Sequence, residues 1–220
     1  MDDACSCGVR GEQGKIVASC ARRLPLDDPT MKTTIMKKKT SPRPWLFPRP
    51  VLLLSTRDKR GRDNIITISW AGVACTKPPM VTVSLRTSRH SHAVISSTKE
   101  FVANIPTSKQ IHIVEACGTT SGKDTDKFAA LGLDKHPAAI VSAPLVAVCP
   151  INLECQVRHT MQLGSHDLFV AEVVKVHAQH DLLREDGEIN DQALDCLAWG
   201  SEEFFRVLRP PKQALVPRFL

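Results

Sequence analysis

The sequence lacks any apolar run of the length that a membrane helix requires. Such a helix needs about 20 apolar residues, whereas the longest apolar stretches, Val51–Leu54 and Ile140–Cys149, are of strand length and broken by polar residues or proline. The chain opens Met1-Asp2-Asp3 and lacks the apolar centre of a secretory signal. These absences argue against a membrane-spanning or secreted protein, so we expect a cytoplasmic location.

Two binding motifs are also missing from the sequence. No GxGxxG follows a predicted strand, which excludes a Rossmann site for NAD(P)H. The Cys5-Ser6-Cys7 pair has the wrong spacing for zinc and no matching second pair, so we expect no metal site. Five other cysteines stand among apolar or small neighbours and are expected to be buried reduced thiols: Cys75, Cys117, Cys149, Cys155 and Cys196.

Basic residues exceed acidic ones, giving a formal net charge of +6 over 220 residues. Part of this excess lies in one stretch, at Lys32, Lys37, Lys38, Lys39 and Arg43. No aromatic residues interleave with these cations and no nucleic-acid motif follows them. The pattern therefore favours a solvated, flexible arm over a nucleic-acid partner.

The chain length suits one domain with some residues left for a tail. Residues 1–40 show no clear period and are predicted to be a poorly ordered N-terminal extension. Residues 41–210 are predicted to form the domain, entered through a proline-rich extended segment at 42–50. Residues 211–220 remain as a C-terminal tail.

The hydrophobic pattern of the domain is mainly β. Strands are expected at residues 51–56, 65–70, 80–85, 100–105, 145–148, 151–159 and 167–179, and residues 202–207 are expected to close the chain against the domain. Short helices are expected at residues 92–97, 109–116 and 125–131, the last capped by Asp124 or Thr125. Many strands with few short helices indicate a β-barrel with helical inserts.

A cluster of cations and hydroxyls follows the strand at 80–85. Arg86, Ser88, Arg89 and Ser91 lie within a few positions, just before the helix expected at 92–97. Guanidinium groups, hydroxyls and the N–H groups of a helix start together suit a phosphate. The alternative is a solvated turn with surface arginines, but so many donors directly after a buried-looking strand favour a phosphorylated cofactor.

Four segments in a specific order carry a resemblance to a known family. They are residues 50–56 leading to 64–70, residues 78–91, residues 101–106 with 117–128, and residues 152–155 with 163–169. In this order and spacing, from about Pro48 to Leu208, the chain resembles the flavin reductase-like family, which includes the flavoredoxins. The resemblance implies a six-stranded antiparallel Greek-key split barrel. It also implies a homodimer with FMN in a groove near the subunit interface.

The resemblance further implies contacts with the flavin ring from the strand that ends near Trp70. The candidates are Thr67, Ser69, Trp70 and Ala71 on that strand, with Ser84 on the neighbouring strand. Lys127, farther along, is a candidate for contact with the flavin or its phosphate. The phosphate contacts fall on Arg86, Ser88, Arg89 and Ser91. For Trp70 the alternative is a core aromatic at a strand end, and for Lys127 it is an exposed helix lysine.

His166, in the turn Gly164-Ser165-His166-Asp167, is the candidate catalytic residue. In the resembling reductases a histidine here borders the flavin side where a nicotinamide or electron partner docks, so it can position the donor or deliver a proton. The alternative is a turn histidine bonded to backbone. The chain also departs from the family: it has no tyrosine, and His90-Ser91 stands where many relatives carry tyrosine. An aromatic wall is then missing, or is supplied by Trp70 or the partner subunit.

The sequence therefore indicates an FMN-binding oxidoreductase that moves electrons from NAD(P)H or another donor to a flavin or redox-protein acceptor. One alternative is a flavoredoxin-like electron carrier with little NAD(P)H activity. Another is a non-enzymatic ligand-binding protein on the same barrel, against which the retained cluster at residues 86–91 argues.

Overall fold

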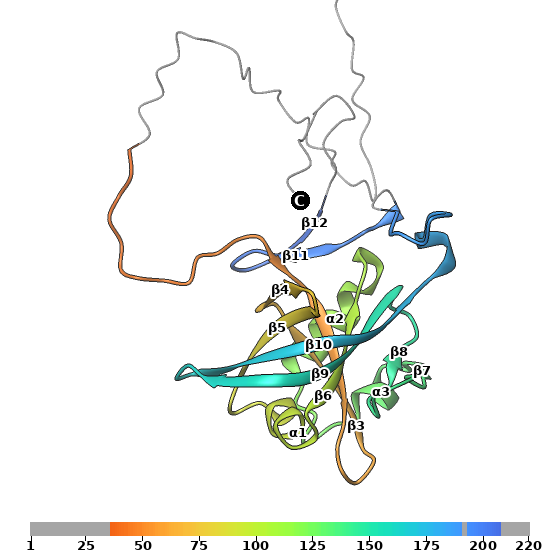
Figure 1. The fold of residues 1–220 in the computed structure, drawn as a ribbon. Coiled ribbons are helices and arrows are strands. Elements are labelled where there is room, and N and C mark those ends of the chain that lie inside the picture. The colour runs from red at the N-terminus through yellow and green to blue at the C-terminus, as the bar shows by residue number, and fades with distance from the viewer. Residues whose placement is uncertain (1–35, 191–192, 208–220) are drawn as a thin grey trace, which may run out of the picture. The chain divides into compact units, whose positions relative to one another are not determined.

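The structure is a computed structural model that describes residues 36–190 and 193–207 (Figure 1). Most of the predicted N-terminal extension and all of the predicted C-terminal tail lie outside these residues. Residues 36–43 are exposed and form neither helix nor strand. The chain from Pro44 onward forms a compact unit of its own, which carries all the elements described below.

The main element is an antiparallel sheet of seven strands within the described residues, in the order β3-β2-β6-β9-β10-β5-β4. The strands are β2 (Leu52–Arg57), β3 (Asp63–Ile68), β4 (Ala71–Thr76), β5 (Pro79–Arg86), β6 (Glu100–Ile105), β9 (Ile151–Gln162) and β10 (His166–Ala178). The mainly β, antiparallel fold class is confirmed. Six of these strands match predicted ones, and β4 was missed because its mostly exposed side chains give no apolar alternation.

The two outer strands of this sheet, β3 and β4, are neighbours in sequence. Only Ser69 and Trp70 separate Ile68, the end of β3, from Ala71, the start of β4. The backbone N–H of Ser84 donates to the Trp70 carbonyl at 2.8 Å, which ties this link to β5. Because two residues bridge the two edges, the sheet must curl into a barrel.

The core follows the two-residue period of the strands. Leu54, Ile66 and Ile68 pack inside the barrel with Phe101 and Phe169, all buried. The alternate residues Leu53 and Ile65 face the opposite side, where they pack with buried side chains of the helical inserts, among them Val114 and Phe128. Burial on both faces explains why the β2 and β3 sequences read as continuous apolar runs.

The helical inserts are α1 (His90–Thr98), η1 (Ser108–Gln110), α2 (Ile111–Thr119), α3 (Lys127–Ala130) and η2 (His180–Leu182). All three predicted helices, α1, α2 and α3, are present with shifted ends. The predicted caps of the third were wrong. Asp126 is the N-cap of α3, since its carboxylate accepts from the N–H groups of Phe128 at 3.0 Å and Ala129 at 3.1 Å.

A second antiparallel sheet joins the start of the domain to its end. Among the described residues it contains β1 (Arg49–Pro50), β11 (Leu197–Trp199) and β12 (Phe204–Arg206), in that order. In the view of Figure 1, β11 and β12 lie above β4 and β5. The expected closure of residues 202–207 against the domain is confirmed by this pairing. A small pair, β7 (Lys135–His136) with β8 (Leu145–Val146), completes the strands.

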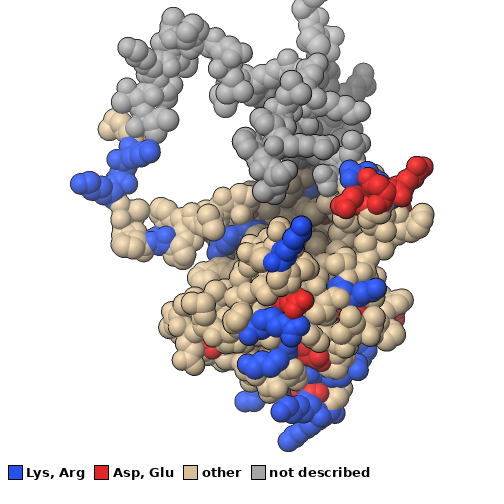
Figure 2. All heavy atoms as spheres, viewed as in Figure 1, with Lys and Arg blue, Asp and Glu red and all other residues tan. Residues whose placement is uncertain are grey.

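The five cysteines of the described part of the chain carry free thiols: Cys75, Cys117, Cys149, Cys155 and Cys196. Three are buried as expected, whereas Cys75 and Cys196 are partly exposed. In the residues described, no helix has the length and apolar character needed to span a membrane. Basic and acidic side chains are interspersed on the face shown in Figure 2.

Candidate functional site

A cleft of about 1030 Å³ opens beside the β3–β4 link and collects most of the predicted site residues. Those lining it are Thr67, Ser69, Trp70, Ser84, Arg86, Arg89 and His166. A smaller hollow of about 290 Å³ shares Arg86 and Arg89 with the cleft and adds Ser88, Ser91 and Lys127. Ala71 lines neither, because it begins β4 and packs against the barrel core.

The small hollow is the basic end of the site. Arg86 ends β5 and Arg89 is the N-cap residue of α1, so the turn between them projects both guanidinium groups from one corner of the barrel. No side chain of the described residues caps α1, and the first N–H groups of a helix lack partners within it. These donors and the helix dipole favour an anion in the hollow.

Lys127 adds a buried cation to this hollow. It is only 3 % exposed, and its ammonium donates to the carbonyls of Cys117 at 3.2 Å and Thr120 at 3.1 Å. The exposed-lysine alternative is therefore wrong. Burial lowers the pKa of Lys127, the charge of Arg89 lowers it further, and only the nearby Cys117 opposes the shift. A neighbouring anion would relieve this strain on the charged form.

Contacts of Asn64 with Ser91 and with the loop at Gly122 shape the hollow further. The side-chain amide of Asn64 donates to the Ser91 hydroxyl oxygen at 2.7 Å, which leaves the buried Ser91 free to donate its own hydrogen. Gly122 passes so close that a Cβ there would lie 1.8 Å from Oδ1 of Asn64. A side chain here would require Asn64 to move, so glycine favours this approach of the loop, which brings the Thr120 carbonyl to Lys127.

Trp70 and His166 form a flat wall in the larger cleft. Their rings stack with centroids 4.4 Å apart and an interplanar angle of 15°. Trp70 is 38 % exposed, so the alternative of a buried core aromatic is wrong. Trp70 of the β3–β4 link and His166 of β10 thus give the larger cleft an aromatic surface, whereas His90, which stands in place of the family's tyrosine, lines the smaller hollow.

His166 is held at the start of β10, opposite Arg86 of β5 in the antiparallel register. Its Nδ1 lies 2.8 Å from the Ser165 hydroxyl, so the imidazole hydrogen-bonds to a side chain and not to backbone. Partial burial lowers the pKa of His166, and the charge of Arg86 lowers it further. The imidazole is therefore held neutral to a lower pH than an exposed histidine, and it can accept a proton inside the cleft.

Thr67 faces away from the barrel interior and has its hydroxyl engaged. Its Oγ1 donates to the Val114 carbonyl of α2, where Gly118 leaves room for its side chain. Thr67 thus fixes α2 against β3 at the floor of the cleft. Its side chain has a structural role in addition to the predicted ring contact.

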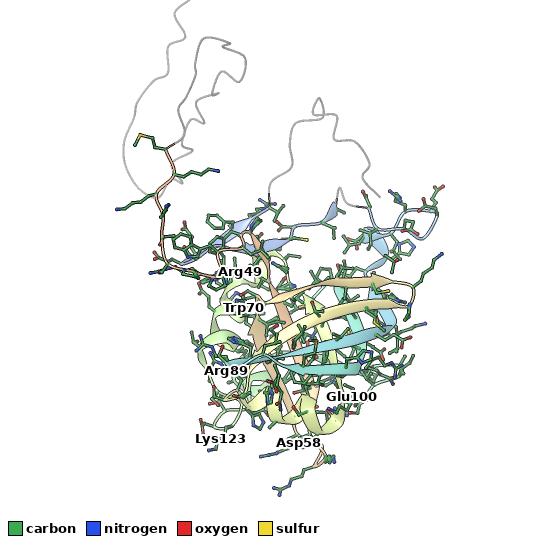
Figure 3. All side chains as sticks on the ribbon, turned by 60° about the vertical axis from the view of Figure 1, so that its left-hand side comes forward. Arg49, Asp58, Trp70, Arg89, Glu100 and Lys123 are labelled. Carbon is green, nitrogen blue, oxygen red and sulfur yellow. The ribbon has the colours of Figure 1, made fainter. Side chains whose placement is uncertain are left out.

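Sequence reasoning missed the far end of the cleft. That end is lined by Arg49, Trp199, Glu202, Glu203 and Phe204. Figure 3 shows Arg49, Trp70 and Arg89 one below another along the same side of the domain. No local motif links residue 49 with residue 199, and only the pairing of β1 with β11 brings them together.

The donor set suits a molecule with a phosphate and a flat ring. Three cations and a helix start converge on the small hollow, and a stacked aromatic wall borders the adjoining cleft. Residues on both sides of the cleft are apolar, including Ile66, Leu85 and Val114. FMN meets both requirements, since it carries one phosphate and a planar isoalloxazine ring.

Comparison with known proteins agrees with this geometry. The flavin reductase like domain matches residues 45–205. A flavoredoxin of Desulfovibrio vulgaris (Miyazaki F) superimposes with a TM-score of 0.75 at 31 % identity, covering 82 % of this chain and 98 % of its own. An uncharacterized protein of Archaeoglobus fulgidus is 32 % identical over 66 % of this chain and 79 % of its own. The reductase component of a 4-nitrophenol 4-monooxygenase/4-nitrocatechol 2-monooxygenase of Rhodococcus opacus is 32 % identical over 51 % of this chain and 57 % of its own.

Proposed function

The chain belongs to the flavin reductase-like family, and on this basis we propose that it is an FMN-binding oxidoreductase. It takes electrons from NAD(P)H or another donor and passes them to a flavin or a redox-protein acceptor. The observation that carries the proposal is the buried Lys127 beside Arg86 and Arg89, directly adjoining a cleft with an aromatic wall. The free thiols fit a reducing compartment, so we place the protein in the cytoplasm.

The protein's own residues divide the work along the cleft. Arg86, Arg89 and Lys127 bind the phosphate, and the Trp70–His166 pair orients the ring and shields one side of it from water. When bound, FMN supplies the hydride and electron chemistry, while the protein sets its position and electrostatics. His166, neutral over more of the physiological range, can take up or hold a proton at its imidazole.

A flavoredoxin-like electron carrier is the second candidate, supported by the likeness to the Desulfovibrio vulgaris flavoredoxin. Steady-state oxidation of NADH and NADPH by the flavin-loaded protein separates the two candidates. Turnover above the rate of free FMN supports the reductase. Bound flavin without such turnover supports the carrier.

The visible absorption spectrum of the purified, untagged protein tests the cofactor. We expect a yellow protein that releases FMN on heating, identified by chromatography, and that loses the colour when Arg89 is replaced by alanine. Arg89→Ala removes charge-assisted hydrogen bonds of about 1.5–3 kcal/mol, so FMN should bind roughly 10- to 100-fold more weakly.

Arg60→Ala is the matched control, because Arg60 is exposed on the β2–β3 turn and outside the cleft. Riboflavin, which lacks the phosphate, should bind the parent protein and Arg89→Ala alike. A protein that stays colourless on titration with FMN would reject the flavin proposal and favour a non-enzymatic binding protein. Equal FMN affinity of Arg89→Ala and Arg60→Ala would reject the phosphate site.

A homodimer is part of the same proposal. Apolar side chains are exposed on β4 and at the β9–β10 turn, with Val73 82 %, Met161 52 % and Leu163 58 % exposed. A second copy would remove this surface from water. Sedimentation velocity should give twice the 24.2 kDa of one chain, and a single species at the monomer mass would contradict the dimer.

A further inference from the structure

Arg49 is a cation at the opposite end of the cleft from the phosphate hollow. Its Nη2 donates to the Gly200 carbonyl at 2.8 Å, and its guanidinium lies 4.8 Å from the centre of the Phe47 ring. Its Nε is shielded from water and has no partner among the described residues. A guanidinium offers five N–H donors, and a buried donor without a partner costs about 1–3 kcal/mol. Arg49 nevertheless lines the cleft, so the Nη N–H groups that the Gly200 carbonyl does not occupy can donate to an anion bound there.

The β11–β12 hairpin adds aromatic and acidic groups to the lining of the same cleft. Trp199 and Phe204 meet edge to face with centroids 4.5 Å apart at 62°. Both side chains are only partly buried and both line the cleft. Glu202 and Glu203, at the tip of the hairpin, are exposed and line it too. This end therefore offers a ring-binding surface, one cation and two carboxylates.

The cleft is large for one small molecule. Pockets that bury a single drug-sized ligand have volumes of about 300–1,000 Å³, and here the phosphate hollow of about 290 Å³ adds to a cleft of about 1030 Å³. If the flavin extends from Arg89 to Trp70, the Arg49 end stays free. Arg49 and Arg89 both line the same continuous cleft, so a second molecule at the Arg49 end can reach the ring position.

We propose that the Arg49 end is a subsite for the adenosine diphosphate part of the nicotinamide donor, and that it selects NADH over NADPH. Arg49 binds the diphosphate, and the Trp199–Phe204 pair contacts the adenine. Glu202 or Glu203 accepts hydrogen bonds from the adenosine ribose hydroxyls, as acidic residues do in other NAD sites. The same carboxylates repel a 2′-phosphate. This inference rests on the proposed function, because it assumes a nicotinamide donor.

Calorimetric titration with ADP-ribose and with 2′-phospho-ADP-ribose tests the subsite without turnover. Both the FMN-loaded and the flavin-free protein are used. We expect ADP-ribose to bind at least 10-fold more tightly than its 2′-phosphate. Arg49→Met should weaken ADP-ribose binding at least 10-fold while its FMN affinity stays within 2-fold of the parent value. Arg49→Lys should bind ADP-ribose with an affinity between those of the parent protein and Arg49→Met.

The double variant Glu202→Gln/Glu203→Gln reports on selectivity without touching Arg49. It should reduce the preference for ADP-ribose to less than 3-fold, and the same change should appear in the KM values for NADH and NADPH. Equal binding of the two ligands, no binding, or an unchanged affinity in Arg49→Met would overturn the subsite. The titration of the flavin-free protein tests the subsite without FMN. The cofactor proposal is tested separately, because its failure would appear as a lack of FMN binding.

Discussion

Replacing Lys127 by methionine is expected to weaken FMN binding by about 10- to 100-fold without lowering the stability of the flavin-free protein. Lys127 is 3 % exposed, and its ammonium donates only to two carbonyls in the described structure. Burying a cation without an opposite charge is unfavourable, as the lowered pKa of Lys127 also indicates. Methionine has a similar length and no charge, so it removes the penalty together with the phosphate contact.

A loss of FMN affinity without a loss of stability distinguishes a binding residue from a structural one. FMN affinity is measured by fluorescence quenching, and the free energy of unfolding by urea denaturation of the flavin-free protein. Lys123→Met is the matched control, since Lys123 is exposed on the loop that precedes α3 and lies at the edge of the domain in Figure 3. A large loss of stability in Lys127→Met with unchanged FMN affinity would show that this lysine serves the fold alone.

The pH dependence of FMN binding should also report the charge of Lys127. Because Lys127 has a lowered pKa in the flavin-free protein, it loses its charge at a lower pH than an exposed lysine. FMN affinity should therefore decrease as pH rises through that lowered pKa, and the decrease should be smaller in Lys127→Met. An equal decrease in both proteins would assign it to another group.

Replacing Glu154 by glutamine is expected to lower the free energy of unfolding at pH 7 by about 3 kcal/mol. The Glu154 side chain is 0 % exposed. Its carboxylate accepts from the N–H groups of Ala139 at 2.8 Å, Ile140 at 2.7 Å and Val141 at 3.0 Å, and lies 2.6 Å from Nε2 of His177. One buried carboxylate thus holds the loop between β7 and β8 against the sheet, and glutamine cannot satisfy so many donors.

The pKa of Glu154 gives the pH window of this effect. Burial alone would raise the pKa, but the His177 contact and the three N–H groups lower it from 4.5 to about 2. Since the folded-state pKa lies below the unfolded one, the stabilisation is complete above about pH 4.5. It is lost as the pH falls from there toward 2.

Urea denaturation at pH 7 and at pH 3 measures both parts of this prediction. The stability difference between the parent protein and Glu154→Gln should be smaller at pH 3 than at pH 7. Glu172→Gln is the control, because Glu172 forms only a partly exposed ion pair with Arg158 and should change stability by less than about 1 kcal/mol. A Glu154→Gln protein as stable as this control at pH 7 would refute the assignment.

Sequence reasoning succeeded where a local pattern reports on a local structure. The apolar runs at β2 and β3 predicted buried strands, and the cations and hydroxyls at residues 86–91 predicted a basic corner because they follow one strand end. It missed the strand β4, whose side chains mostly face solvent, and it did not predict the burial of Lys127. The burial of that lysine depends on carbonyls of another segment, which local helix periodicity does not contain.

The far end of the cleft was beyond sequence reasoning for a different reason. Arg49 meets Trp199 only through the pairing of two short strands that are 150 positions apart. Strands of two or three residues have no measurable period. Long-range pairing of such short elements is decided by the rest of the barrel, so the subsite became visible only in three dimensions.

The two-residue link between β3 and β4 has a consequence for folding. Closing a barrel normally requires distant chain segments to meet, and the entropy lost grows with the length of the loop that is closed. Here the two edges are adjacent in sequence, so the seam of the barrel costs almost no loop entropy once β2–β3 and β4–β5 have formed as local hairpins. Trp70 lies on that seam. The Trp70 half of the aromatic wall is therefore placed by one of the most local connections in an otherwise long-range topology, whereas His166 reaches it from β10.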